Sequence, residues 1–152
     1  MSMDTILVAV GDGDEGRLET FARTTTDLST AGDATVALAH VFGSEEYERA
    51  KRELDFDPDG EVTPDAVAKR YVTIRRLGDA LTESGVSFER YGRIVNDETK
   101  GERVVSLANE IDADLVVVGG RKRSPTGKAV FGSTAQEVML NAPCPVTFVR
   151  GD

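Results

Sequence analysis

The sequence is poor in the residues that build redox and soft-metal sites. It has no tryptophan, one cysteine (Cys144) and one histidine (His40). A single cysteine excludes an intrachain disulfide, and one cysteine with one histidine cannot supply the ligand set of a zinc site. Any metal ion would therefore need oxygen ligands. Cys144 stands in an Ala-Pro-Cys-Pro sequence beside an apolar run and is expected to be a small, half-buried hydrophobic residue.

Long apolar runs are also absent. None approaches the roughly 20 residues that span a bilayer. The first residues, Met1 to Asp4, lack the basic segment and the small-residue cleavage site of a signal peptide. We therefore expect a cytoplasmic protein without a membrane partner. The 152 residues are the size of one ordinary domain, and a single domain over 1–152 is predicted.

Positive charge is scarce. The net charge is −9, from 27 acidic and 18 basic side chains. This balance argues against a nucleic-acid or anionic-membrane surface, because both partners are polyanions. Only five of the basic residues are lysine and aromatic residues are few, a composition typical of halophilic surfaces. The alternative is an ordinary acidic protein.

Apolar runs and helical stripes alternate along the whole chain. Strands are predicted at 5–10, 35–41, 86–95, 115–118 and 146–149, and helices at 17–31, 65–84, 98–113 and from 133 onward. This alternation predicts an α/β fold, a three-layer open five-stranded parallel sheet with strand order 3-2-1-4-5. The runs 5–10, 35–41 and 115–118 are apolar throughout and are expected to be central, whereas the other two are expected at the edges.

The stretch at about 42–65 is predicted to be an acidic loop insertion. It carries many acidic residues and a turn signal, Asp57-Pro58-Asp59-Gly60. A short charged helix at 45–53 is left open. A calcium loop is not favoured, because no glutamate follows the aspartates at the required spacing.

The window from Val118 to Thr134 contains the residues expected to bind a ligand. It follows a central strand, so it lies where the strand order reverses and where ligands bind. Between Asp114 and Glu137 there is no acidic residue, although the chain there has four basic ones: Arg121, Lys122, Arg123 and Lys128.

The end of this window, Gly132-Ser133-Thr134, opens the last predicted helix. The free N–H groups of a helix start favour an anion, and glycine allows close backbone approach. A phosphate cradle is predicted. The alternative is that Ser133 only caps the helix and the arginines form a solvated turn. A Walker P-loop is excluded, since Lys122 replaces a required glycine and Ala129 replaces the serine or threonine.

End to end, the chain resembles the universal stress proteins of the UspA type, and in composition their haloarchaeal members. The resemblance lies in the opening strand, in Leu38-Ala39-His40-Val41, and in the closing Gly-Ser helix followed by Pro-Cys-Pro-Val. Nucleotide-binding members carry Gly-x2-Gly-x9-Gly-Ser/Thr. Here Gly119 and Gly132-Ser133 match, whereas Lys122 stands at the middle glycine. The resemblance implies a Rossmann-like fold of the adenine nucleotide alpha hydrolase type.

The resemblance also implies an adenine nucleotide ligand, ATP or AMP, that is bound and not turned over. Gly11 stands where the family places an aspartate near the ribose and adenine, with Asp12 one residue later, so Asp12 or Asp14 is expected to take that role. Mg²⁺ is expected to accompany ATP, with Asp12 and Asp14 as candidate oxygen ligands near the phosphates. The implied nucleotide-binding residues are Val10, Gly11, Asp12, Val41, Val118, Gly119, Gly120, Lys122, Arg123, Gly132, Ser133 and Thr134.

Two other functions remain open: a weak ATPase, and an interaction module that binds no nucleotide. Dedicated nucleotidyl transferases and ATP pyrophosphatases of related fold need His-x-Gly-His or Ser-Gly-Gly-x-Asp-Ser, and neither is present. The last strand is a short edge, and open edges invite pairing across a two-fold axis. A homodimer through Val146 and Phe148 is therefore predicted, and the resemblance implies the same contact.

Overall fold

The computed structural model describes residues 3–57, 59–120 and 131–150. The strands are β1 (Thr5–Ala9), β2 (Thr35–Gly43), β3 (Phe88–Val95), β4 (Leu115–Gly120) and β5 (Val146–Arg150). The helices are α1 (Leu18–Gly32), α2 (Ser44–Glu53), α3 (Pro64–Arg70), α4 (Val72–Glu83), α5 (Lys100–Glu110) and α6 (Ser133–Asn141), and a short 3-10 helix, η1 (Asp12–Arg17), precedes α1.

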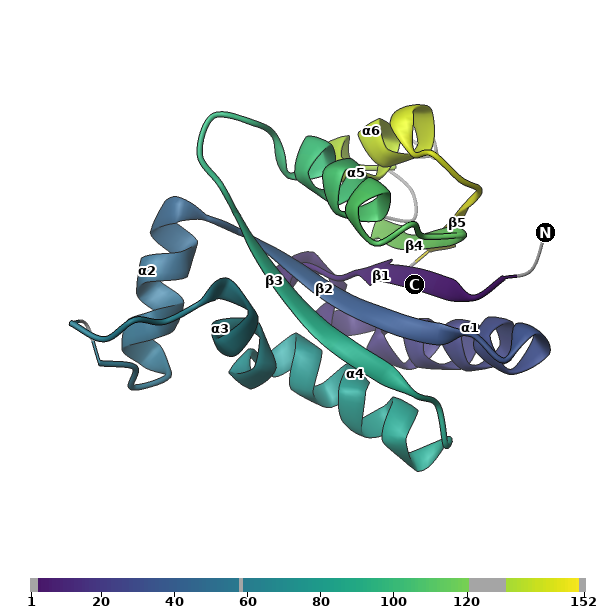
Figure 1. Cartoon of the computed structure of the whole chain (residues 1–152), viewed down its shortest axis with the longest axis horizontal. Helices are drawn as coiled ribbons and strands as arrows, with labels where there is room; N and C mark the ends of the chain where they lie inside the picture. The colour runs from purple at the N-terminus through teal and green to yellow at the C-terminus, as the bar shows by residue number, and fades with distance from the viewer. Residues whose placement is uncertain (1–2, 58, 121–130, 151–152) are drawn as a thin grey trace.

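The strands form one parallel sheet in the order β3-β2-β1-β4-β5 (Figure 1). In the register of the central strands, Leu7 of β1 lies opposite Ala37 of β2 and Val116 of β4. The predicted fold class and strand order are confirmed. The mixed runs predicted as edges, β3 and β5, do occupy the two edges.

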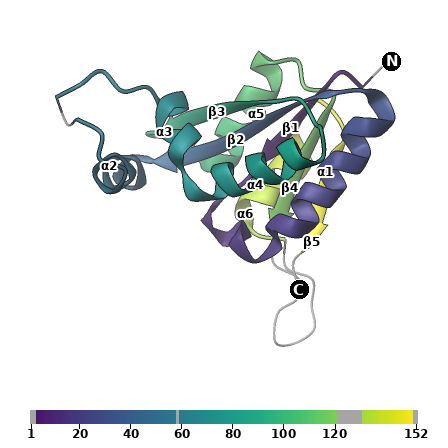
Figure 2. The ribbon, with the colours of Figure 1, turned by 90° about the horizontal axis from the view of Figure 1, so that it is seen from below.

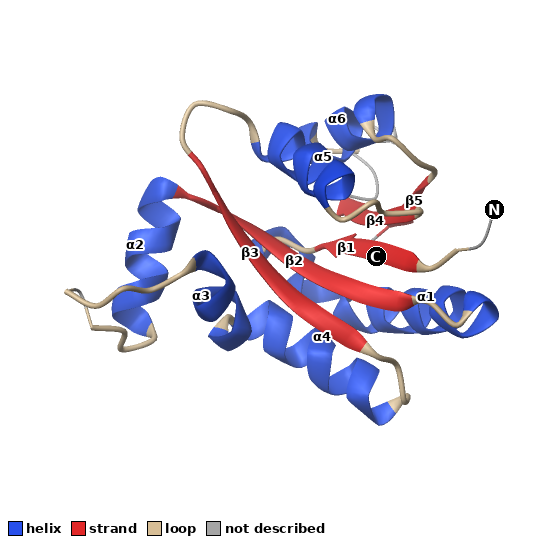
Figure 3. Ribbon diagram, viewed as in Figure 1, coloured by secondary structure: helices blue, strands red, loops and turns tan. Residues whose placement is uncertain are grey.

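Helices cover both faces of the sheet, which explains the continuous apolar runs of the central strands. α1 and α4 lie on one face and α5 and α6 on the other (Figures 2 and 3). The alternating side chains of β1 serve different cores: Ile6 and Val8 pack with Phe21 in one, whereas Leu7 packs with Leu107 in the other. Each fully buried aliphatic side chain contributes about 1.5–3 kcal/mol.

The helix predicted at 65–84 is two helices, and that prediction was wrong at Tyr71. This residue has extended backbone angles (φ −69°, ψ 137°), ending α3 and preceding α4. The break lets the Tyr71 ring stack on His40, with ring centroids 4.4 Å apart. It also lets α3 dock on β3, where the Gly92 amide donates to Asp65 at 2.8 Å. A Cβ on Gly92 would lie 2.0 Å from the Pro64 carbonyl oxygen, so this docking requires glycine.

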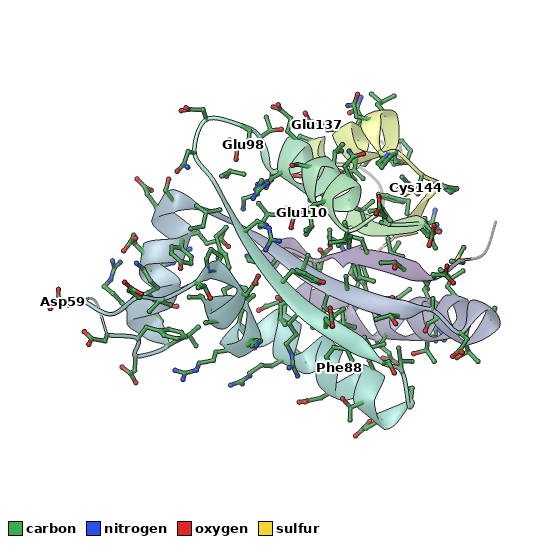
Figure 4. All side chains as sticks on the ribbon, in the orientation of Figure 1. Asp59, Phe88, Glu98, Glu110, Glu137 and Cys144 are labelled. Atoms are coloured by element: carbon green, nitrogen blue, oxygen red, sulfur yellow. The ribbon has the colours of Figure 1, made fainter. Side chains whose placement is uncertain are left out.

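The acidic stretch is more ordered than the predicted loop. Phe42 belongs to β2, and residues 44–53 form α2, so the short charged helix is present. A third hydrophobic cluster forms here from Phe42, Tyr47, Ala50, Val67 and Ala68. Tyr47 and Ala50 share one face of α2, while the carboxylates of Glu45 and Glu48 are exposed. The loop itself is confined to the residues between α2 and α3, and Figure 4 shows Asp59 at its tip, away from the sheet.

None of the helices in the described ranges is both long and apolar enough to cross a membrane.

Candidate functional site

A cavity of about 260 Å³ opens at the carboxyl ends of the central strands. The strand order reverses between β1 and β4, and open α/β sheets bind ligands outside the carboxyl ends of the strands at such a position. Its volume is near the lower end of small-molecule pockets, roughly 300 Å³. Its lining comes from β1 and the loop after it, β2, β4, the first two turns of α5 and the first turn of α6: Ala9, Val10, Gly11, Gly13, Asp14, Ala39, Val41, Lys100, Val104, Val118, Gly119 and Thr134.

Two sides of the cavity are apolar. Val41 comes from β2, Val118 from β4, and Val104 from the second turn of α5. Aliphatic side chains on facing elements make a slot for a flat, poorly hydrated ring, held by burial and not by hydrogen bonds. The backbone of Val10 is already engaged, because its N–H donates to the Ala39 carbonyl at 3.0 Å and its carbonyl oxygen lies 2.8 Å from His40 Nδ1.

Asp14 and Arg17 fix the loop that follows β1. One oxygen of the buried Asp14 carboxylate accepts from the Gly11 amide at 2.8 Å, and the other accepts from Arg17 Nε at 2.5 Å. The remaining Arg17 nitrogens donate to the Gly120 carbonyl at 2.7 Å and the Gly13 carbonyl at 2.8 Å. Charge-assisted, multidentate bonds of this kind define geometry well. Both oxygens of Asp14 thus serve the protein's own backbone and Arg17.

The two glycines at the end of β4 have different roles. A Cβ on Gly119 would lie 2.6 Å from Asp14 Oδ1 and 2.7 Å from the Phe21 ring, so glycine is needed where the cavity meets the η1 loop. A Cβ on Gly120 would lie 2.3 Å from the Phe131 carbonyl oxygen and 2.7 Å from the Phe148 ring. Gly120 therefore accommodates the returning chain and does not line the cavity.

The first turn of α6 forms one rim of the cavity. Gly132 precedes the helix in the left-handed φ region (φ 81°), and Ser133 is the first helical residue. Gly132, and not Ser133, is thus the capping residue, and among the described residues no side chain accepts a capping hydrogen bond there. Amides at a helix start that lack a capping partner can bind an anion. Thr134 adds a hydroxyl to the cavity wall.

The neighbouring rim is the first turn of α5. Thr99 and Glu102 form a capping box, with the Glu102 amide donating to Thr99 Oγ1 at 3.1 Å and the Thr99 amide donating to Glu102 at 3.2 Å. The Thr99 hydroxyl also donates to Glu137 of α6 at 2.6 Å. This bond joins the start of α5 to the second turn of α6.

Lys100 brings a positive charge to the cavity. Its Nζ donates to Glu46 Oε1 at 3.2 Å. Glu46 also accepts from the Gly43 amide at 3.0 Å and from the Tyr71 hydroxyl at 3.3 Å, and its Oε2 lies 3.0 Å from His40 Nε2. Burial alone would raise the pKa of Glu46, but the bond to and charge of His40, the Gly43 amide and Lys100 together hold it well below its usual range.

Six of the predicted site residues line the cavity: Val10, Gly11, Val41, Val118, Gly119 and Thr134. Gly132 and Ser133 form the adjacent helix start, and Gly120 packs elsewhere. The described residues do not include Lys122, Arg123, most of the basic window or the Asp12 side chain. The Mg²⁺ hypothesis therefore stays a prediction. In the part of the chain that is described, no three His, Cys, Asp or Glu side chains converge as metal ligands.

Sequence reasoning missed Ala9, Gly13, Ala39, Lys100 and Val104. Ala9 could have been found, because it adjoins Val10 at the end of β1. Ala39 could have been found because it lies two residues before Val41, on the same face of β2. Lys100 had a weaker signal. It opens the helix that follows β3, and every such helix in a parallel sheet begins at the ligand-binding edge.

A second hollow, of about 310 Å³, lies at the opposite end of the sheet beside Cys144 (Figure 4). Burial, with a smaller contribution from the charge of Asp114, raises the pKa of the Cys144 thiol. The Asp114 carboxylate is engaged by the amides of Asp4 and Thr5, at 2.9 and 3.0 Å. This hollow therefore offers a thiol whose pKa is raised and a carboxylate that already accepts two backbone hydrogen bonds.

Comparisons with known proteins agree with this geometry. A universal stress protein from Mycolicibacterium smegmatis is 35% identical over 91 residues, covering 60% of this chain and 68% of that protein. The solved universal stress protein of Archaeoglobus fulgidus is 27% identical with a TM-score of 0.68, covering 95% of this chain and 97% of that one.

A second solved structure from Archaeoglobus fulgidus, a universal stress protein in complex with dAMP, is 21% identical with a TM-score of 0.65, covering 97% and 98% of the two chains. The family model for universal stress proteins matches residues 3–150. Since this match extends over nearly the whole sequence, the chain belongs to the universal stress protein family.

Proposed function

We propose that this universal stress protein binds an adenine nucleotide, AMP or ATP, in the cavity and acts as a regulator through binding and dimerisation. The observation that carries the proposal is the cavity itself: an apolar slot between Val41, Val104 and Val118 that leads to the open helix start at Gly132. The dAMP complex of the similar Archaeoglobus fulgidus protein supports the choice of ligand.

In this proposal the base occupies the slot and the phosphates lie at the start of α6. The amides after Gly132 and the Thr134 hydroxyl donate to the phosphate oxygens. The basic side chains Arg121, Lys122, Arg123 and Lys128 would supply neutralising charge from the adjoining segment. Mg²⁺ would accompany ATP, with Asp12 as the candidate ligand.

The direct test is calorimetric titration of the purified protein with AMP and ATP, together with mass spectrometry of any small molecule released from the native protein. Saturating ligand at about 100 times its dissociation constant should stabilise the fold by about 2.7 kcal/mol. The absence of binding to both nucleotides and of any melting shift would favour the interaction module.

A cavity-filling variant tests the location. Val41→Phe places a ring in the slot and should weaken AMP binding at least tenfold. Val72→Phe is the matched control, because Val72 is 41% exposed on α4, away from the cavity. Equal affinities for the two variants would place the nucleotide elsewhere.

The rate of ATP hydrolysis distinguishes a nucleotide-binding regulator from the remaining alternative, an enzyme that hydrolyses ATP. A regulator that binds nucleotide needs only slow hydrolysis, or none. Steady-state ATP hydrolysis above about one turnover per second, the low end of ordinary enzyme rates, would favour an enzyme instead.

A further inference from the structure

Lys100 is the one lysine or arginine whose side chain lines the cavity among the described residues. It lies on α5, which packs over β2 and β3, whereas α6 packs over β4 and β5. The cationic side chain and the open helix start at Gly132 therefore lie over different strands of the sheet. A nucleotide whose phosphates lie at α6 extends its base toward Val41 and Lys100.

Glu46 holds Lys100 at this position and is itself held from several sides. Its two oxygens receive the Gly43 amide, the Tyr71 hydroxyl and His40 in addition to Lys100. An ammonium group has three N–H donors and no acceptor. With one directed at Glu46, two remain for a ligand. The Lys100 side chain is 46% exposed, so these donors are accessible.

We propose that Lys100 binds the base by donating a hydrogen bond to a ring nitrogen of the purine, with Glu46 as the residue that positions it; this rests on the nucleotide-binding function proposed above. A donor-only group favours a base edge that presents an acceptor, and adenine presents N1, N3 and N7. A hydrogen bond to a charged group corresponds to roughly ten- to hundredfold in affinity.

The test combines a variant with nucleotide analogues. AMP and its 1-deaza, 3-deaza and 7-deaza analogues, each lacking one ring acceptor, are titrated against the wild type, Lys100→Met and Lys69→Met. Methionine keeps the aliphatic stem of lysine, and Lys69 is an exposed lysine of α3.

The wild type should bind one of the analogues about tenfold or more weakly than it binds AMP. Lys100→Met should bind AMP more weakly than the wild type by a similar factor. It should bind that analogue as well as it binds AMP, because the hydrogen bond that both changes remove is already absent. Lys69→Met should match the wild type. Unchanged AMP binding in Lys100→Met would overturn the assignment, as would an undiminished analogue effect. If Lys100→Met weakened the binding of AMP but not of adenosine, Lys100 would contact the phosphate and not the base, and the assignment would also be refuted.

If the wild type binds none of these nucleotides, both the proposed function and this inference are refuted. If the wild type binds them and Lys100→Met binds them equally well, only this inference is refuted. Glu46 is tested in the same assay. Glu46→Gln should weaken AMP binding in the wild-type background but not in the Lys100→Met background. Equal losses in both backgrounds would assign Glu46 a structural role only.

Discussion

His40 and Glu46 form a mostly buried pair that joins the sheet to α2, with Nε2 and Oε2 3.0 Å apart. His40 is 1% exposed, and its other nitrogen faces the Val10 carbonyl at 2.8 Å. Both ring nitrogens thus lie within hydrogen-bond distance of an oxygen atom, the Val10 carbonyl on one side and the Glu46 carboxylate on the other. Leaving a buried polar group without its hydrogen-bond partner typically destabilises a protein by about 1–3 kcal/mol.

The pair predicts a specific loss of stability in acid. Because the pKa of Glu46 is depressed in the folded protein, its stabilising contribution is complete above its ordinary value of 4.5 and is lost as the pH falls below it. In urea unfolding, the stability advantage of the wild type over Glu46→Gln should shrink as the pH is lowered through this range. Glu53→Gln, an exposed change on α2, is the control. A constant difference between wild type and Glu46→Gln would contradict the prediction.

Gly119→Ala should destabilise the fold and displace the η1 loop. The added methyl would lie 2.6 Å from Asp14 Oδ1 and 2.7 Å from Phe21. Overpacking of this kind typically lowers the free energy of unfolding by about 1–3 kcal/mol. Chemical denaturation measures the loss. Gly16→Ala is the matched control: its Cβ would meet nothing within 4 Å, so it should be neutral or slightly stabilising. Similar values for the two variants would show that the loop adapts freely.

The proposed homodimer through β5 predicts that Val146→Lys is monomeric in light scattering. Val146 is a half-buried residue at the start of this edge strand, paired only with β4 in the sheet. Val72→Lys, a like change on α4, should remain dimeric. Phe148→Lys is less informative, because the Phe148 ring packs on Phe131 with centroids 5.2 Å apart, and its loss would also disturb the fold. Persistence of the dimer in Val146→Lys would refute this interface.

Cys144 should react slowly with alkylating reagents at neutral pH. Burial and the nearby Asp114 raise its pKa, which lowers the thiolate fraction that does the chemistry. Iodoacetamide modification, followed by mass spectrometry, should be slower in the folded protein than in urea. Equal rates in the two states would show that the thiol is neither shielded nor perturbed.

The fold was predictable to the extent that it depends on local pattern. Continuous apolar runs identified the central strands, and parallel connectivity fixed their order. The break at Tyr71 was not predictable in this way, because the partners that the two helices meet through it, His40 and Gly92, are distant in sequence. The order in α2 depends likewise on a cluster that Tyr47 completes with Val67 of α3.

For the site, strand-end residues such as Val41 and Val118 were predicted because topology places those ends together. Lys100 was missed because its orientation depends on how α5 is rotated, which the packing of Val104 and Leu107 and the contact between Thr99 and Glu137 determine. The halophilic surface and the cytoplasmic location stay predictions.

Arg17 links two segments about a hundred residues apart in the chain. Through its bonds to Asp14, Gly13 and Gly120, the end of β4 and the entrance to α1 share one guanidinium. Any displacement of the Gly120 carbonyl must therefore break a charge-assisted bond or carry the entrance to α1 along with it. The strand end and the loop across from it are mechanically coupled, so a rearrangement at one is transmitted to the other.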